Sequence, residues 1–135
     1  SKSKLALKMA SGTARFITGK LGRIDKKNIT IKTPSATIGI RGTDFTTTVD
    51  ELGRSLIILL PNEDGTSSGE ITVETWAGIE ILNEPFQATM VQTMDSQPTK
   101  AVVLGNLTLG LINNMLIMMS EIDNAKKIIF LEIFF

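Results

Sequence analysis

The sequence predicts an all-β domain, an antiparallel β-sandwich or rolled sheet of short strands, and three observations support this. Apolar and polar residues alternate over short runs, and glycine or proline separates one run from the next. The centres of these runs recur roughly every 8 to 12 residues, which is the spacing of antiparallel sandwiches. With 135 residues, the chain is long enough for one domain with its own core. We therefore expect strands from about Lys4 to Val91, and any helix only in the C-terminal third.

The first strands are expected before residue 34. Residues 5–9 and 13–18 alternate on either side of a glycine, which predicts a hairpin. A basic connection, residues 19–28, follows. Residues 29–33 predict a strand that ends at Pro34, because proline fixes its own φ and favours extended backbone in the residue before it.

The stretch TPSATIGIRGTDF, residues 33–45, carries the densest local signals. In the strand 35–40, alternate apolar side chains share one face, and Gly39 lies on the other, where it would let another backbone approach. Arg41 follows between two apolar segments and is flanked by glycines. We expect a bulge that makes Arg41 structural and at least partly buried. Its guanidinium would then bind loop carbonyls or one of the carboxylates of Asp44, Asp50, Glu70 and Glu74.

Residues 45–49 continue the pattern into a turn at 50–53, where Gly53 can adopt a left-handed conformation. Residues 54–60 are apolar on both faces, which predicts a central strand covered on both sides. Three further strands are expected at 71–75, 79–82 and 86–91.

The motif at 33–45 resembles the signature of the FecR domain family, in which a Thr-Pro pair, an Ala-Thr-Ile-Gly strand and an Arg-Gly-Thr step occur in this order. The matching positions are Thr33, Pro34, Ala36, Thr37, Ile38, Gly39, Arg41, Gly42, Thr43 and Phe45. The resemblance extends from Gly12 to about Val91. The structural motif that we predict comprises Thr33, Pro34, Thr37, Gly39, Arg41, Gly42, Thr43 and Asp44.

The resemblance implies two functions. Domains similar to FecR occur in secreted, surface and virion proteins, which implies a non-catalytic protein–protein interaction or structural module that presents β-edges and loops in an extracytoplasmic, surface or virion assembly. FecR proteins are also membrane-spanning regulators, which implies the alternative of an extracytoplasmic sensor portion of an anti-sigma regulator. We expect the first, because the spanning helix and cytoplasmic helical region of the regulators are not visible in these residues.

The composition argues against catalysis and against nucleic acid as a partner. Fourteen basic and fourteen acidic residues cancel, so no overall field attracts nucleic acid or an anionic membrane. Cysteine, histidine and tyrosine are absent, which removes thiol nucleophiles, imidazole bases and the commonest zinc ligands. We expect no enzyme activity, cofactor or metal site. Glu63-Asp64-Gly65 offers oxygen ligands without the spacing of a calcium loop and predicts a hairpin tip.

Three segments are expected: a FecR-like β-domain at 1–94, a linker or last strand at 95–104, and an apolar tail at 105–135. The tail could be a helix or strand that closes the domain's own core, a surface that docks onto another chain, or a membrane contact. Trp76 could pack in the core or anchor an interface. We expect a homo-oligomer or a subunit of a larger assembly, with possible interface residues Trp76, Leu116, Ile117, Met118, Phe130, Phe134 and Phe135.

Overall fold

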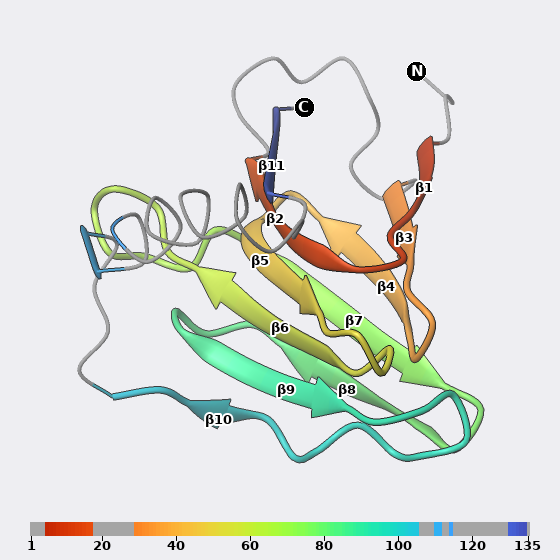
Figure 1. The fold of residues 1–135 in the computed structure, drawn as a ribbon. Coiled ribbons are helices and arrows are strands. Elements are labelled where there is room, and N and C mark those ends of the chain that lie inside the picture. Colours follow the sequence, from red (N-terminus) through yellow and green to blue (C-terminus); the bar gives the residue numbers. More distant parts are fainter. Residues whose placement is uncertain (1–4, 18–28, 106–109, 112–113, 115–129, 135) are drawn as a thin grey trace.

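Two sheets pack face to face in the computed structural model, which describes residues 5–17, 29–105, 110–111, 114 and 130–134 (Figure 1). Sheet A has five strands in the order β1 (Leu5–Lys8), β3 (Ile29–Lys32), β4 (Thr37–Arg41), β7 (Glu70–Thr75) and β8 (Gly78–Leu82). Sheet B has six, in the order β10 (Val102–Val103), β9 (Gln87–Val91), β6 (Ser55–Leu60), β5 (Asp44–Val49), β2 (Gly12–Ile17) and β11 (Phe130–Phe134). This confirms the predicted all-β sandwich. In the described part of the chain, helical backbone occurs only at residues 110, 111 and 114.

The predicted hairpin between residues 5–9 and 13–18 is wrong. β1 pairs in parallel with β3 in sheet A, whereas β2 pairs antiparallel with β5 in sheet B. The backbone N–H of Met9 donates to the carbonyl of Lys32, so the chain leaves sheet A only after that residue. Alternation predicted both strands, but it does not specify which partner each strand meets.

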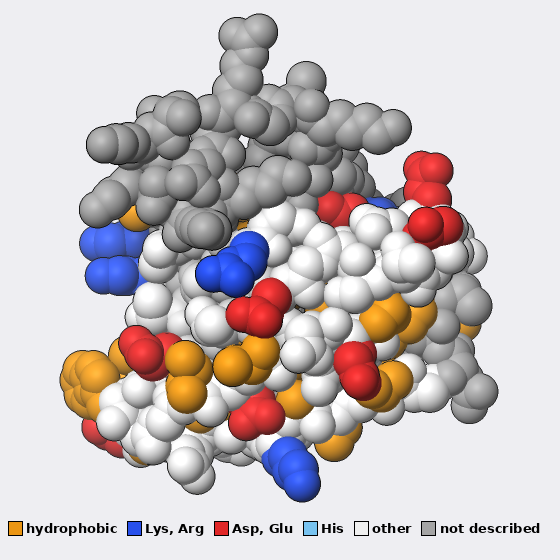
Figure 2. Space-filling model, turned by 180° about the vertical axis from the view of Figure 1, so that it is seen from behind, with side chains coloured by type: hydrophobic (Ala, Val, Ile, Leu, Met, Phe, Trp, Pro, Cys, Tyr) orange, Lys and Arg blue, Asp and Glu red, His pale blue; other side chains and the backbone are white. Residues whose placement is uncertain are grey.

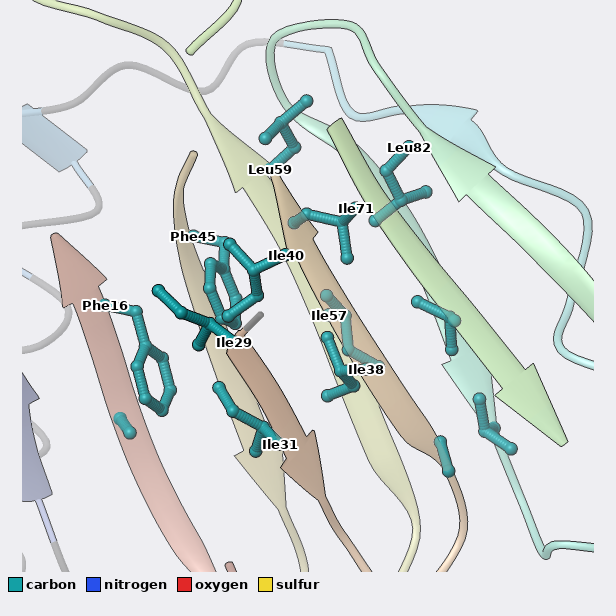
Figure 3. Packing of buried hydrophobic residues seen from close by; sticks show 14 residues of the cluster. Phe16, Ile29, Ile31, Ile38, Ile40, Phe45, Ile57, Leu59, Ile71 and Leu82 are labelled. Atoms are coloured by element: carbon teal, nitrogen blue, oxygen red, sulfur yellow. The ribbon is translucent and has the colours of Figure 1, made fainter. Parts of the chain in front are cut away.

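The core between the sheets is built from the alternate residues of each strand. Sheet A contributes mainly isoleucines, and sheet B adds Phe16 and Phe45, whose stacked rings lie 4.6 Å apart between centroids (Figure 3). The strongly buried members include Ile29, Ile31, Ile38, Ile40, Ile57, Leu59, Ile71, Val73 and Leu82. This large apolar cluster forms within the chain itself and supplies the main driving force for folding.

The prediction of a central strand at residues 54–60 is confirmed. β6 lies between β5 and β9, and its residues Ile57 and Leu59 face the core. On the opposite face, Ile58 and Leu60 form a second buried cluster with Ala88. Both faces of this strand are therefore buried, which explains its continuous apolar sequence.

The segment after Val91, which includes the predicted linker or last strand at 95–104, is hydrogen-bonded to the rest of the fold. Pro98 is buried, the backbone N–H of Thr99 donates to the carbonyl of Met90, and the hydroxyl of Thr89 donates to the carbonyl of Thr99. β10 then pairs antiparallel with β9, which agrees with the alternative of a last strand.

The described end of the tail packs within the same chain. β11 pairs in parallel with β2, with Phe130 opposite Thr13 and Phe134 opposite Ile17. The described end of the tail thus extends sheet B of the same chain. Leu116, Ile117, Met118 and Phe135 lie outside the described residues. No helix in the described part of the chain is long and apolar enough to cross a membrane.

Candidate interaction surface

The Thr-Pro turn of the motif joins the two sheets. The Thr33 hydroxyl oxygen accepts hydrogen bonds from the backbone N–H groups of Ser35 and Ala36, at 3.2 and 3.0 Å. The Ser55 hydroxyl, at the start of β6 in the other sheet, lies 2.7 Å from the Thr33 hydroxyl and 2.6 Å from the Ser35 hydroxyl. Ser35 and Ser55 are each 1% exposed. The motif therefore holds the β3–β4 turn against sheet B, and Pro34 lies exposed at the tip of this turn.

A second set of hydroxyl contacts follows the Arg-Gly-Thr step. Gly42 has a φ of 60°, and Thr43 is buried with its hydroxyl 2.9 Å from the hydroxyl of Ser68. The Ser68 hydroxyl donates to the Leu60 carbonyl at 2.6 Å and accepts from the Asp44 backbone N–H at 3.0 Å. These contacts fix the step from sheet A into β5 of sheet B.

The expected close approach of a backbone to Gly39 is wrong. A Cβ atom at Gly39 would meet the side-chain oxygen of Thr72 at 2.6 Å, so its neighbour there is a side chain. The backbone contact occurs instead at Gly69, where a Cβ atom would lie 2.3 Å from the carbonyl oxygen of Arg41. Gly69 has a φ of 150°, which also favours glycine.

Arg41 is exposed, so the prediction of a buried structural arginine is wrong. β4 pairs regularly with β7 through its last residue, where Arg41 lies opposite Glu70, and the expected bulge does not form. Regular alternation therefore places Arg41 on the same face as Thr37 and Gly39, away from the core. None of the described carboxylates forms an ion pair with it.

The strand registers arrange the side chains on the outer face of sheet A in rows. Two rows cross all five strands, and each runs from β1 to β8. The first contains Lys8, Lys32, Thr37, Glu74 and Ile79. The second contains Ala6, Thr30, Gly39, Thr72 and Ile81. Arg41 and Glu70 begin a third row.

Charge and hydrophobicity are unevenly distributed on this outer face. Lys8 and Lys32 lie on the β1–β3 side, whereas Glu70 and Glu74 lie on β7. Figure 2 shows hydrophobic and acidic side chains close together in the lower half of the view, basic side chains at the left, and further basic side chains near the centre and at the bottom. The outer face thus has a basic side and an acidic, apolar side.

Trp76 is 78% exposed in the turn between β7 and β8, so the alternative of core packing is wrong. The turn is held in place, because the backbone N–H of Trp76 donates to the carbonyl of Met94 and the Ala77 N–H donates to the Thr75 hydroxyl. Ile79 and Ile81 on β8 are 51% and 44% exposed. We call Trp76, Ile79 and Ile81 the hairpin surface. Sequence patterns found only Trp76, although Ile79 and Ile81 were visible as alternate members of an expected strand.

The edge of β8 is partly covered by the segment that follows β9. The Glu80 carboxylate accepts a hydrogen bond from the Ala101 backbone N–H at 3.0 Å, and the side chain of Gln97 lies against Gly78. A partner of the hairpin surface would therefore contact side chains on the face of the sheet, and would find few unpaired backbone groups at its edge.

The acidic residues that were considered as possible calcium ligands lie in a turn. Asp64 accepts hydrogen bonds from the side chain and the backbone N–H of Thr66, and these bonds lower the pKa of its carboxyl below the ordinary value. With Gly65 at a φ of 85°, Glu63-Asp64-Gly65 is an exposed loop tip. Among the described residues, no three side chains of metal-binding type are grouped closely enough to hold an ion.

Comparison with known families gives a match, and it covers the part of the chain that contains the motif. The family model described as FecR protein matches residues 1–63. This range includes the whole motif and β1 to β6, and it ends before the expected limit near Val91 and before the hairpin surface. Comparisons with curated proteins and with solved structures give no match. Residues 1–63 are thus similar to the FecR family, as the motif TPSATIGIRGTDF predicted.

Proposed function

We propose that this chain is a non-catalytic protein–protein interaction module that works in an extracytoplasmic, surface or virion assembly. The observation that carries the proposal is the hairpin surface, which exposes Trp76, Ile79 and Ile81 on a domain whose core is already closed. Large apolar side chains that remain exposed next to one another are typical of binding sites.

The energetics of the hairpin surface suit binding. Burying each of its large side chains contributes roughly 1.5 to 3 kcal/mol, and tryptophan is among the residues that dominate interface energies. The turn that carries Trp76 is fixed by hydrogen bonds to Met94 and Thr75, so its backbone needs little further ordering on binding. The absence of cysteine, histidine and tyrosine from the sequence supports a non-catalytic role.

The extracytoplasmic location rests on the FecR match over residues 1–63, and so does a second candidate function. In that candidate, the chain is the extracytoplasmic sensor portion of a FecR-type anti-sigma regulator, and the hairpin surface would contact the receptor. A spanning helix and a short cytoplasmic helical region encoded in the same gene would favour the regulator. Many copies of the chain in a regular particle would favour the structural module.

Site-specific photo-crosslinking in the native cells tests the proposal. A photoreactive residue replaces Trp76 in one variant and Leu52 in the other, since Leu52 is equally exposed, at 78%, in the turn between β5 and β6. We expect a discrete protein adduct from position 76 and none from position 52. Equal adducts at both positions, or no adduct at position 76, would contradict the proposed function.

A further inference from the structure

We propose that the outer face of sheet A binds a second copy of this chain, in a two-fold dimer whose axis runs parallel to the strands and passes over β4. This inference rests on the proposed function, because it names the partner of the surface that includes Ile79 and Ile81.

The charges on the face complement themselves. Along the first row, Lys8 and Lys32 occupy β1 and β3, Thr37 lies at the centre on β4, and Glu74 and Ile79 occupy β7 and β8. One end of the row is thus basic and the other end is acidic and apolar, so each end is complementary in charge to the opposite end of a second copy. A homodimer with two-fold symmetry uses the same patch on both copies, so such a patch has to be self-complementary.

A two-fold axis along β4 brings the complementary ends together. It places β3 of one copy over β7 of the other, and β1 over β8, while each row stays at its own level. Lys32 then lies over the partner's Glu74 in both halves of the dimer. The methylene groups of Lys8 cover the partner's Ile79, with the ammonium group in water.

The second row fits the same arrangement. Ala6 lies over the partner's Ile81, and Thr30 lies over the partner's Thr72. Gly39 is at the centre of the row, over the partner's Gly39, and the Thr72 side chain lies against it.

A shallow hollow near the axis accommodates the exposed arginine. The hollow has a volume of about 160 Å³ and is lined by Gly39, Ile40, Arg41, Glu70 and Thr72. Arg41 lies on the axis strand, so the two Arg41 side chains meet near the axis, and each extends sideways to reach the partner's Glu70, a carboxylate with which it forms no ion pair in its own chain. The dimer would thus pair a guanidinium that has no described ion-pair partner in the monomer.

The charge distribution excludes the other simple arrangement. A two-fold axis across the strands would place each strand over its own copy, so Glu74 and Glu70 would face the same acidic strand of the partner. Lys8 and Lys32 would likewise lie over β1 and β3 of the partner, the strands that carry its own Lys8 and Lys32. Like charges placed opposite each other across an interface are unfavourable, which selects the axis parallel to the strands.

The size of the face predicts a weak dimer. Five strands at their usual spacing and about five residues of each strand give a face roughly 24 Å wide and roughly 16 Å long. Such a face covers roughly 380 Å² on each copy, less than half of the roughly 800 Å² per partner of a standard interface, so we expect a dissociation constant on the order of micromolar to tens of micromolar. Because exposed ion pairs contribute, raising the salt concentration should weaken the dimer.

Two charge-reversal variants of the full chain test the inference. In Lys32→Glu and in Glu74→Lys, each two-fold dimer would bring like charges together at both pairs, so we expect at least about a tenfold loss of self-association. An equimolar mixture of the two variants restores both opposite-charge pairs and should form a heterodimer with an affinity near that of the parent. Sedimentation velocity at low salt measures all three samples, and circular dichroism checks that each variant is folded.

Lys100→Glu is the matched control, since Lys100 is exposed in the segment after β9 and outside the outer face of sheet A. It should dimerise like the parent. The proposed dimer would be contradicted if the parent chain stayed monomeric at high micromolar concentration. It would also be contradicted if the variants dimerised as well as the parent, or if their mixture did not associate. An adduct with a different protein at position 76 would still support the proposed function.

Discussion

The hydroxyl contact between Ser35 and Ser55 should contribute more to the free energy of unfolding than an exposed hydrogen bond does, because it joins the two sheets in a buried site. Ser55→Ala removes the hydroxyl that lies 2.6 Å from that of Ser35 and 2.7 Å from that of Thr33. Ser35 is 1% exposed, so water cannot easily replace the lost partner. The substitution should therefore strand a buried hydroxyl group.

The expected magnitude follows from that stranded group. A buried polar group that loses its partner costs about 1 to 3 kcal/mol, whereas removing both partners together costs much less. We expect Ser55→Ala and Ser35→Ala each to lower the free energy of unfolding by about 1 to 3 kcal/mol. The double variant should be less destabilised than the sum of the two, with a coupling of at least about 0.5 kcal/mol.

Urea denaturation followed by far-ultraviolet circular dichroism measures these free energies, and it reports the strands of both sheets. Ser96→Ala is a suitable control, because Ser96 makes a similar hydroxyl contact with Thr93 at 2.9 Å on the surface. Its effect should stay within about 0.5 kcal/mol. Strictly additive effects of the Ser35 and Ser55 substitutions would refute the reasoning that the two hydroxyls depend on each other.

Three further predictions concern backbone, surface and charge. Gly69→Ala should destabilise the chain by at least about 3 kcal/mol, because its Cβ would overlap the Arg41 carbonyl. Gly65→Ala, with a positive φ but open space around it, should cost only about 1 to 2 kcal/mol, and equal losses in chemical denaturation would contradict the steric explanation. Arg41→Lys should change the stability of the dilute chain by less than about 0.5 kcal/mol, because Arg41 is exposed; a larger loss would indicate a buried role. Partial desolvation raises the pKa of Asp50, but hydrogen bonds from the side chain and backbone of Arg54 and from the Leu52 N–H outweigh it and lower this pKa below 3.8. Because a lowered pKa in the folded state stabilises the protein only above the ordinary value, Asp50→Asn should reduce stability near pH 7 and have little effect once the pH falls below the lowered pKa. A loss of equal size at both pH values would contradict this assignment.

Local patterns in the sequence predicted what depends on neighbouring residues. Alternation placed Ile38 and Ile40 in the core, and the doubly apolar run at 55–60 predicted a strand buried on both faces. The turn at residues 50–53 was also predicted correctly, since Gly53 has a φ of 85°. These features follow from the two-residue period of a strand and from the conformational limits of single residues.

Long-range partners could not be predicted in the same way. The parallel pairing of β1 with β3 joins segments separated by a basic connection, and no local signal specifies it. Arg41 was assigned to the interior because of its apolar neighbours, although its odd position relative to Ile38 and Ile40 indicated the outer face. The sequence is compatible with Trp76 in the core or at an interface, and only its position in a tight turn of the fold shows that it is exposed.

Quenching of tryptophan fluorescence tests the central claim most directly, because Trp76 is the only tryptophan in the chain. We expect a neutral quencher such as acrylamide to reach Trp76 freely in the dilute chain and much less when the chain is bound to its protein partner, while Leu52→Ala changes neither result. A tryptophan that is already protected in the dilute monomer, or one that stays equally accessible after assembly, would contradict the claim that the hairpin surface is a protein interface.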